Sequence, residues 1–241
     1  MVAGGKGQFI EAIQSAARNF SLNQQEYEWT TLVLAFYAVD GAPWNSPEGQ
    51  QIDFNLLADR VMRELQPGGV CYGQHRLYTL TILLRIDAQI KAEHDRGLLT
   101  DQTRDQVKNY LMEMTARAYQ TQSSEGYWDG NWPDTDRPVR DPETNPISRR
   151  ILATGHMLEW WAMAPSELHP PRETIVRAAQ WLTTEIVGME QERIEENYTF
   201  LTHAGRALAL WRGGFADEMY ISLRRDRFAS GKKDHLLPFE R

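Results

Sequence analysis

Residues His156-Met-Leu-Glu-Trp-Trp161 open a predicted helix that is apolar nearly all round over Met157–Met163. Helices that are hydrophobic on every side are buried, so we expect this one in the centre of the molecule. Further helices of the same kind are predicted over Trp29–Val39, Leu77–Ile86 and Ala204–Trp211. Their starts read Glu28-Trp-Thr-Thr-Leu, His75-Arg-Leu-Tyr-Thr-Leu and His203-Ala-Gly-Arg-Ala-Leu.

Amphipathic helices are predicted between these inner helices. In residues 105–119, apolar side chains recur at i, i+3, i+4 and i+7 while charged residues take the other face, as in a helix that covers a core. Similar patterns begin at Ile10, Phe54 and Ile175. No stretch alternates β-branched and polar residues, so we expect no sheet.

The polar residues that open the inner helices are regularly spaced. Glu28, His75, His156 and His203 are separated by 47, 81 and 47 residues. A spacing of 47 fits one αα-hairpin per repeat, and 81 fits one repeat plus an insertion over 122–148. The sequence therefore predicts an all-α fold of four αα-hairpin repeats that form an α/α toroid, complete or incomplete. The expected limits are a disordered leader over 1–7, one domain over 8–220 and a basic flexible tail over 221–241.

Charge and composition exclude several function classes. The 241 residues include 26 Lys and Arg against 33 Asp and Glu, a net charge of −7, which disfavours nucleic acid as a partner. The longest uncharged apolar runs are too short to cross a bilayer, so no membrane span is expected. The single cysteine, Cys71, favours a reducing compartment, and we expect a soluble, cytoplasmic protein.

One short motif carries a family resemblance. Gln122-Ser-Ser-Glu-Gly126-Tyr-Trp128 has the Gln-x3-Gly-x-Trp spacing of the QW motif, and it resembles the repeat signature of triterpene cyclases and their α/α-toroid relatives, which include the protein prenyltransferases. The resemblance implies a toroid of inner and outer helices around a ligand cavity. The Asp-x-Asp-Asp acid of the cyclases is incomplete here, because the nearest string is Asp134-Thr-Asp136-Arg137.

A toroid points the N-terminal ends of its inner helices toward one mouth, so the histidines at those ends are expected to converge. Imidazoles can act as acids, bases or metal ligands near neutral pH, and a carboxylate can fix their tautomer. The alternative is that each histidine is a polar anchor that hydrogen-bonds a neighbouring helix. The candidate catalytic residues are His75, His156, Glu159 and His203.

Acidic and aromatic side chains near the inner helices are candidates for contact with a ligand, although core packing is the alternative for each aromatic. No cofactor is expected, and a bound divalent metal ion is the alternative. Zinc accepts mixed Cys and His ligands, and Cys71 and His75 are the candidates for a divalent ion. The predicted ligand-lining residues are Glu28, Trp29, Tyr78, Trp128, Trp132 and Trp160.

The function that these observations predict is the binding of a small apolar or sugar-like ligand in the central cavity, with acid–base catalysis by His and Glu as an open question. The alternative is a non-catalytic helical scaffold or protein-interaction module of a larger protein. The expected partner is accordingly a small molecule or another protein, within a longer polypeptide or an oligomer.

Overall fold

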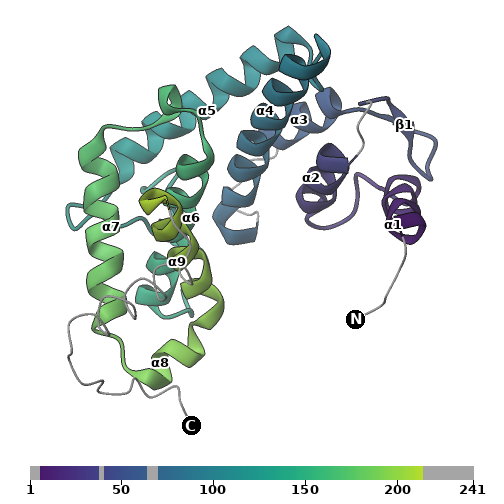
Figure 1. Ribbon diagram of the computed structural model, residues 1–241. Helices are drawn as coiled ribbons and strands as arrows, with labels where there is room; N and C mark the ends of the chain where they lie inside the picture. Colours follow the sequence, from purple (N-terminus) through teal and green to yellow (C-terminus); the bar gives the residue numbers. More distant parts are fainter. Residues whose placement is uncertain (1–5, 38–40, 64–69, 214–241) are drawn as a thin grey trace, which may run out of the picture.

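The computed structural model of the protein describes residues 6–37, 41–63 and 70–213 (Figure 1). These ranges are mostly helical, which confirms the all-α class. The first helix begins at Lys6, two residues before the expected start of the domain. The predicted tail over 221–241 and the first five residues of the predicted leader lie outside the described residues.

Four helices correspond to the predicted inner helices and follow one another through the molecule. They are α2 (Tyr27–Tyr37), α4 (Gln74–His94), α6 (Pro146–Met163) and α9 (Tyr198–Arg212). Helix α4 packs on both α2 and α6, and α6 packs on α9. The inner helices therefore form a continuous row that starts at α2 and ends at α9.

The remaining helices pack against this row. Helix α1 lies on α2, α3 on α4 and α5, α5 on α4, and α7 on α6 and α9. Short 3₁₀ turns precede α4, over Val70–Gly73, and α7, over Ser166–Leu168. The bounds are α1 (Lys6–Arg18), α3 (Phe54–Arg63), α5 (Asp101–Thr121), α7 (Arg172–Val187) and α8 (Gln191–Glu196).

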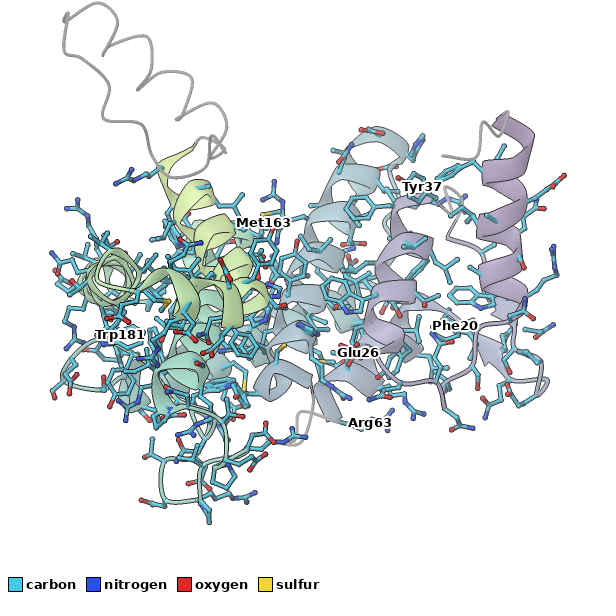
Figure 2. The ribbon with its side chains drawn as sticks, turned by 90° about the horizontal axis from the view of Figure 1, so that it is seen from below. Phe20, Glu26, Tyr37, Arg63, Met163 and Trp181 are labelled. Carbon is cyan, nitrogen blue, oxygen red and sulfur yellow. The ribbon has the colours of Figure 1, made fainter. Side chains whose placement is uncertain are left out.

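The views in Figures 1 and 2 agree on the order of the row in space. Helices α1 and α2 lie at one end, α7 lies at the other, and α4, α6 and α9 lie between them. Over the described ranges the row is open, with its two ends on opposite sides of the molecule.

The expectation of no sheet is wrong in one detail. Residues Trp44–Asn45 pair antiparallel with Gln51–Ile52 around a tight turn, in which Gly49 N donates to Ser46 O at 2.9 Å. Strands of two residues are too short to produce an alternation that could be read from the sequence. The hairpin covers the core between α1 and α3, where Trp44 packs edge-on against Phe54.

The histidines do not all open their helices, which corrects the predicted helix starts. Only His75 lies near an N-terminus, as the second residue of α4. Helix α6 begins at Pro146, where the side chain of Asn145 caps Ile147 N at 2.9 Å, so His156 lies in its middle. Helix α9 begins at Tyr198, so His203 lies inside it as well. Apolar residues upstream of each histidine extend these helices toward the N-terminus.

The segment with the QW spacing follows α5 in the chain and is hydrogen-bonded to α7. Gln122 Nε2 donates to Gly126 O and to Thr174 O, both at 2.9 Å. Gly126 has a φ of 108°, and a Cβ there would lie 2.6 Å from Arg177 O. Only glycine fits this close approach of two backbones.

Trp128 fastens the same segment to α5 and α6. Its side chain is 1% exposed, and its Nε1 donates to Ala118 O at 2.8 Å. Its backbone N donates to Thr154 Oγ1 at 3.0 Å, and its ring meets Trp161 edge-on with centroids 5.6 Å apart. The tryptophan therefore joins an outer helix to an inner one through hydrogen bonds as well as packing.

Helix α2 is not buried all round, contrary to the prediction. Trp29, Val33 and Phe36 are 42%, 38% and 59% exposed. Their i, i+4 and i+7 spacing places them on one face of the helix, and we call them the α2 stripe. The residues of the helix outside this stripe that are buried in the core include Leu32, Leu34 and Ala35.

None of the helices within the described ranges is both long and apolar enough to cross a membrane.

Candidate functional site

The three predicted histidines meet, although they come from three different helices. The rings of His156 and His203 have centroids 3.9 Å apart, and those of His75 and His156 are 5.0 Å apart. His75 and His203 are separated by 6.4 Å. Helices α4, α6 and α9 therefore place one imidazole each in a shared group, which we call the histidine cluster.

Glu159 connects two members of the histidine cluster. Its Oε2 lies 3.0 Å from His156 Nδ1 and 3.4 Å from His203 Nδ1, while its Oε1 accepts a hydrogen bond from Arg206. His156 and Glu159 are three residues apart and therefore lie on one face of α6. The carboxylate is 3% exposed, so one buried anion holds two imidazoles and one guanidinium.

The protonation states follow from burial and these contacts. Burial alone would raise the pKa of Glu159, but hydrogen bonds from His156, His203 and Arg206 hold that pKa well below its usual range. Burial lowers the pKa of His156 to about 4, against the opposing effect of its bond to Glu159. At neutral pH, Glu159 is therefore ionised and His156 is neutral. Because a carboxylate only accepts, His156 Nδ1 carries the proton and Nε2 carries a lone pair.

His75 has the same arrangement with a different carboxylate. Its Nδ1 lies 2.9 Å from Glu26 Oε1, and burial lowers its pKa. Glu26, labelled in Figure 2, lies just before α2. The Nε2 atoms of His75 and His156 are both buried and have no hydrogen-bond partner. Two buried lone pairs are thus left without a donor, which is uncommon in folded proteins.

Cys71 lies beside these two histidines. One ligand atom from each of Cys71, His75 and His156 lies within 4.8 Å of the others, and His156, Glu159 and His203 form a second such group. Burial, with the charges of Glu26 and Glu159, raises the pKa of Cys71 to about 12, so its thiol is protonated. Sulfur and imidazole donors together suit a transition metal.

A left-handed backbone segment brings Cys71 to the cluster. Helix α4 begins only at Gln74, and Cys71, Tyr72 and Gly73 have φ values of 49°, 59° and 78°. Cysteine and tyrosine are both disfavoured in this region by about 1 kcal/mol or more. Trp132 Nε1 donates to Tyr72 O at 3.1 Å and holds the segment in place.

The rim of the cluster is formed by a cation and two aromatic side chains. Arg206 Nη2 donates to Tyr78 OH at 2.7 Å, and its guanidinium lies 5.3 Å from the centre of that ring. Trp29 lies 4.9 Å from His75 and 6.2 Å from Tyr78, between ring centroids. Two of the predicted ligand-lining residues, Trp29 and Tyr78, therefore border the cluster, and the α2 stripe begins there.

Sequence reasoning missed two members of this site. Arg206 is three residues after His203, a spacing that puts both on one helix face, so the signal was available. Glu26 precedes α2 and has a φ of 52°, and no pattern in the sequence marks it as the partner of His75.

The other predicted lining residues have different surroundings. Glu28 is buried against Arg76, with Oε1 3.0 Å from Arg76 Nε. Trp128, Trp132 and Trp160 are at most 1% exposed. Their indole N–H groups are bonded within the core, that of Trp160 to Met157 Sδ at 3.2 Å. Their placement supports the packing alternative and gives no support to a lining role.

The cluster combines a neutral buried imidazole, a more exposed imidazole held by a carboxylate, a thiol and a rim cation. Such a set can transfer protons, bind a polar group or hold a soft metal ion. Comparison of the chain with protein-family models, with curated proteins and with solved structures gave no match.

Proposed function

We propose that the protein binds a small ligand with an apolar body at the histidine cluster and carries out acid–base chemistry on it. The observation that carries the proposal is the contact of buried Glu159 with His156, His203 and Arg206. A carboxylate fixed by three donors is preorganised, because none of its partners has to reorient when charge develops beside it.

His203 is the proton-transferring group in this proposal. Its side chain is 27% exposed against 3% for His156, so it can reach a bound ligand. Imidazole is the side chain most often used as a general acid or base, and Glu159 orients the His203 ring through Nδ1. His156 stays neutral and buried behind it.

The α2 stripe supports an apolar ligand body. Trp29 begins the stripe at the cluster, and Val33 and Phe36 continue it along the helix. Tyr78 OH and Arg206 supply hydrogen-bonding groups at the polar end. Because an aromatic ring also stacks on the apolar face of a sugar, a sugar-like ligand is the second form of the proposal.

The architecture proposed for this function is part of an α/α toroid. The row of inner helices with α1, α3, α5 and α7 packed against it supports the proposal, as does the join made by Gln122 and Trp128.

The alternative function is a helical scaffold in which the polar groups are anchors. One contact favours it, because Gln74 Nε2 donates to Ala153 O at 2.8 Å and bonds α4 directly to α6. The two functions predict different responses of the histidines to a small molecule. A scaffold leaves the histidines unaffected by any small molecule.

The first experiment uses 1-octanol and methyl β-glucoside as probes of the two ligand classes. Each is titrated into chelator-treated protein while histidine and backbone resonances are followed by NMR. We expect octanol to shift the signals of Trp29, His75 and His203, and Trp29→Ala to weaken this binding about tenfold. Val187→Ser is the matched control, since Val187 is an exposed apolar residue of α7.

Turnover is tested with p-nitrophenyl octanoate, whose hydrolysis is accelerated by a general base that activates water. His203→Gln should lower the rate by about 10²-fold or more if that imidazole is the base. Shifts with the glucoside alone would replace the apolar ligand by a sugar. If neither probe moves a cluster resonance and the ester is hydrolysed no faster than in buffer, the scaffold is correct.

A further inference from the structure

We propose that Cys71, His75 and His156 form a binding site for a zinc-like transition metal ion, with one coordination position left open beside His203. The proposal names a cofactor for the proposed function. Only the catalytic role of the ion rests on that function, because the evidence that the ion binds comes from the three side chains.

The first argument is the distance between donor atoms. Zinc–nitrogen and zinc–sulfur bonds of about 2.0–2.3 Å at tetrahedral angles put ligand atoms about 3.3–3.7 Å apart. The donors of Cys71, His75 and His156 already lie within 4.8 Å of one another. A decrease of up to about 1.5 Å in these separations therefore brings the atoms to the distances found around a bound zinc ion.

The second argument is the unfilled bonding capacity of the two imidazoles. The Nε2 atoms of His75 and His156 are buried without a hydrogen-bond partner, and the His156 side chain is 3% exposed. A lone pair kept from water is costly unless a donor or a metal ion accepts it. A metal ion between the two nitrogens and the sulfur satisfies both lone pairs at once.

The third argument is the pair of carboxylates behind the histidines. Glu26 accepts from His75 Nδ1, and Glu159 accepts from His156 Nδ1. Metal-bound histidines almost always donate their other ring N–H to a carboxylate, a carbonyl or water, which fixes the tautomer and makes the ligand nitrogen more basic. Here two independent carboxylates orient two histidines in this way.

The donor set also indicates which ion is bound. Metal binding releases the proton of the Cys71 thiol. The resulting thiolate and the two imidazoles are soft and borderline ligands, which favour zinc and its neighbours over magnesium or calcium. The two carboxylates add negative charge around the position of the cation. The left-handed segment at Cys71 and Tyr72 is the conformation that places the sulfur opposite the histidines.

Three protein ligands leave a fourth position for water or a ligand, as in catalytic zinc sites. His156 belongs to both donor groups, so His203 and Glu159 lie alongside the site. A bound zinc ion lowers the pKa of its water to near 7. With such an ion bound, His203 would be placed to accept the proton of its water.

Cobalt(II) provides a direct test, because Cys71 is the only cysteine in the chain. Metal-free protein is titrated with Co²⁺, and binding is followed by absorption spectroscopy. We expect one equivalent to produce a cobalt–sulfur charge-transfer band and the intense visible bands of a four-coordinate ion. Zn²⁺ should displace the cobalt and abolish both features.

Variants assign the ligands. Cys71→Ser should remove the charge-transfer band, and His75→Gln and His156→Gln should each weaken Co²⁺ binding at least about 100-fold while keeping the helical circular dichroism. His94→Gln is the control, since His94 lies exposed at the end of α4. Absence of a one-equivalent complex in the wild-type protein, or a complex without the sulfur band, overturns the proposal.

The two proposals fail in different measurements. The octanol titration is done without metal, and the cobalt titration without any ligand. Cobalt binding in a protein that ignores both ligand probes leaves the metal site standing and overturns the proposed function. Ligand binding in a protein that takes up no cobalt does the reverse.

Discussion

Two buried polar groups of this molecule differ in one respect. At the contact between α4 and α5, Asp87 is fully buried, with Oδ1 accepting from Leu99 N at 2.8 Å and Oδ2 accepting from Arg104. Arg104 in turn donates to Leu99 O. In the histidine cluster, by contrast, His75 Nε2 and His156 Nε2 have no partner. Burial of a polar group therefore does not by itself indicate a functional site, and the histidine cluster differs in that two adjacent imidazoles each keep a buried ring nitrogen without a donor.

Asp129, in the loop that follows α5, resembles Asp87, because both of its carboxylate oxygens accept hydrogen bonds. These bonds come from Arg149 Nε at 2.9 Å and from Arg150 Nε at 3.2 Å. Gly130 N adds a third bond at 2.7 Å. An aspartate with its oxygens used in this way fastens the loop to α6, and it is not available to a cation.

The largest loss of stability is expected from a change at Asp87, whose carboxylate oxygens both accept hydrogen bonds. Asp87→Ala leaves the largely buried Arg104 without its main partner, and breaking one side of such a pair typically costs about 3–5 kcal/mol. Urea denaturation should show this loss of unfolding free energy. Asp59→Ala, which breaks an exposed pair with Arg63, should change it by less than about 1 kcal/mol. Similar losses in the two variants would mean that the buried Asp87–Arg104 pair stabilises the protein no more than an exposed ion pair does.

The next effect concerns pH and the histidine cluster without metal. The pKa of His156 is about 4 in the folded protein and about 6.5 when unfolded, so the unfolded chain binds the extra proton between these values. Stability should therefore fall as the pH falls from 6.5 to 4, by about 3 kcal/mol in all. Above about pH 4.5, Glu159 adds little to this slope, because its carboxyl is ionised in both the folded and the unfolded chain.

Denaturation curves at pH 7, 5.5 and 4.5 measure this loss. His156→Gln removes the titrating group and should flatten the profile. Part of the slope should persist in that variant, because burial lowers the pKa of His75 in the same direction. An unchanged slope in His156→Gln would show that His156 is not a source of the acid sensitivity.

A smaller effect is expected where Gln122 bonds α5 to α7. Gln122→Ala leaves Gly126 O and Thr174 O without their donor, which costs about 1–3 kcal/mol for a partly buried group. Thermal or urea unfolding measures the change. Thr183→Ala, which removes only an exposed bond to Ala179 O, serves as the comparison and should change stability by less than about 0.5 kcal/mol. Equal effects would remove the special role of the Gln122 join.

The sequence predicted much of this arrangement from helical periodicity. The amphipathic stretch 105–119 lies inside α5, and the histidines from three inner helices do converge. The predicted helix starts were wrong at His156 and His203, because capping at Asn145 and apolar residues upstream extend the helices. Periodicity gives the face of a residue more reliably than its depth along the helix.

What could not be predicted depends on contacts between distant segments. Cys71 reaches the cluster through three consecutive left-handed residues, and only one of them is a glycine. Glu26 meets His75 from a turn, across 49 residues of sequence. The exposure of Trp29 depends on which neighbours cover α2, and an apolar helix does not specify this by itself.

We expect the smallest loss of stability in His203→Gln, and this variant best separates a functional histidine cluster from a structural group such as that of Asp87. His203 is 27% exposed, and its 3.4 Å contact with Glu159 is only one of three that this carboxylate makes. Glutamine keeps a polar group at the position, so the unfolding free energy should change by less than about 1 kcal/mol. Ester hydrolysis should fall about 10²-fold in the same variant, since no other exposed imidazole in the described cluster can take its place. A stability loss as large as that of Asp87→Ala would instead place His203 among the saturated anchors, and the cluster would then be structural throughout.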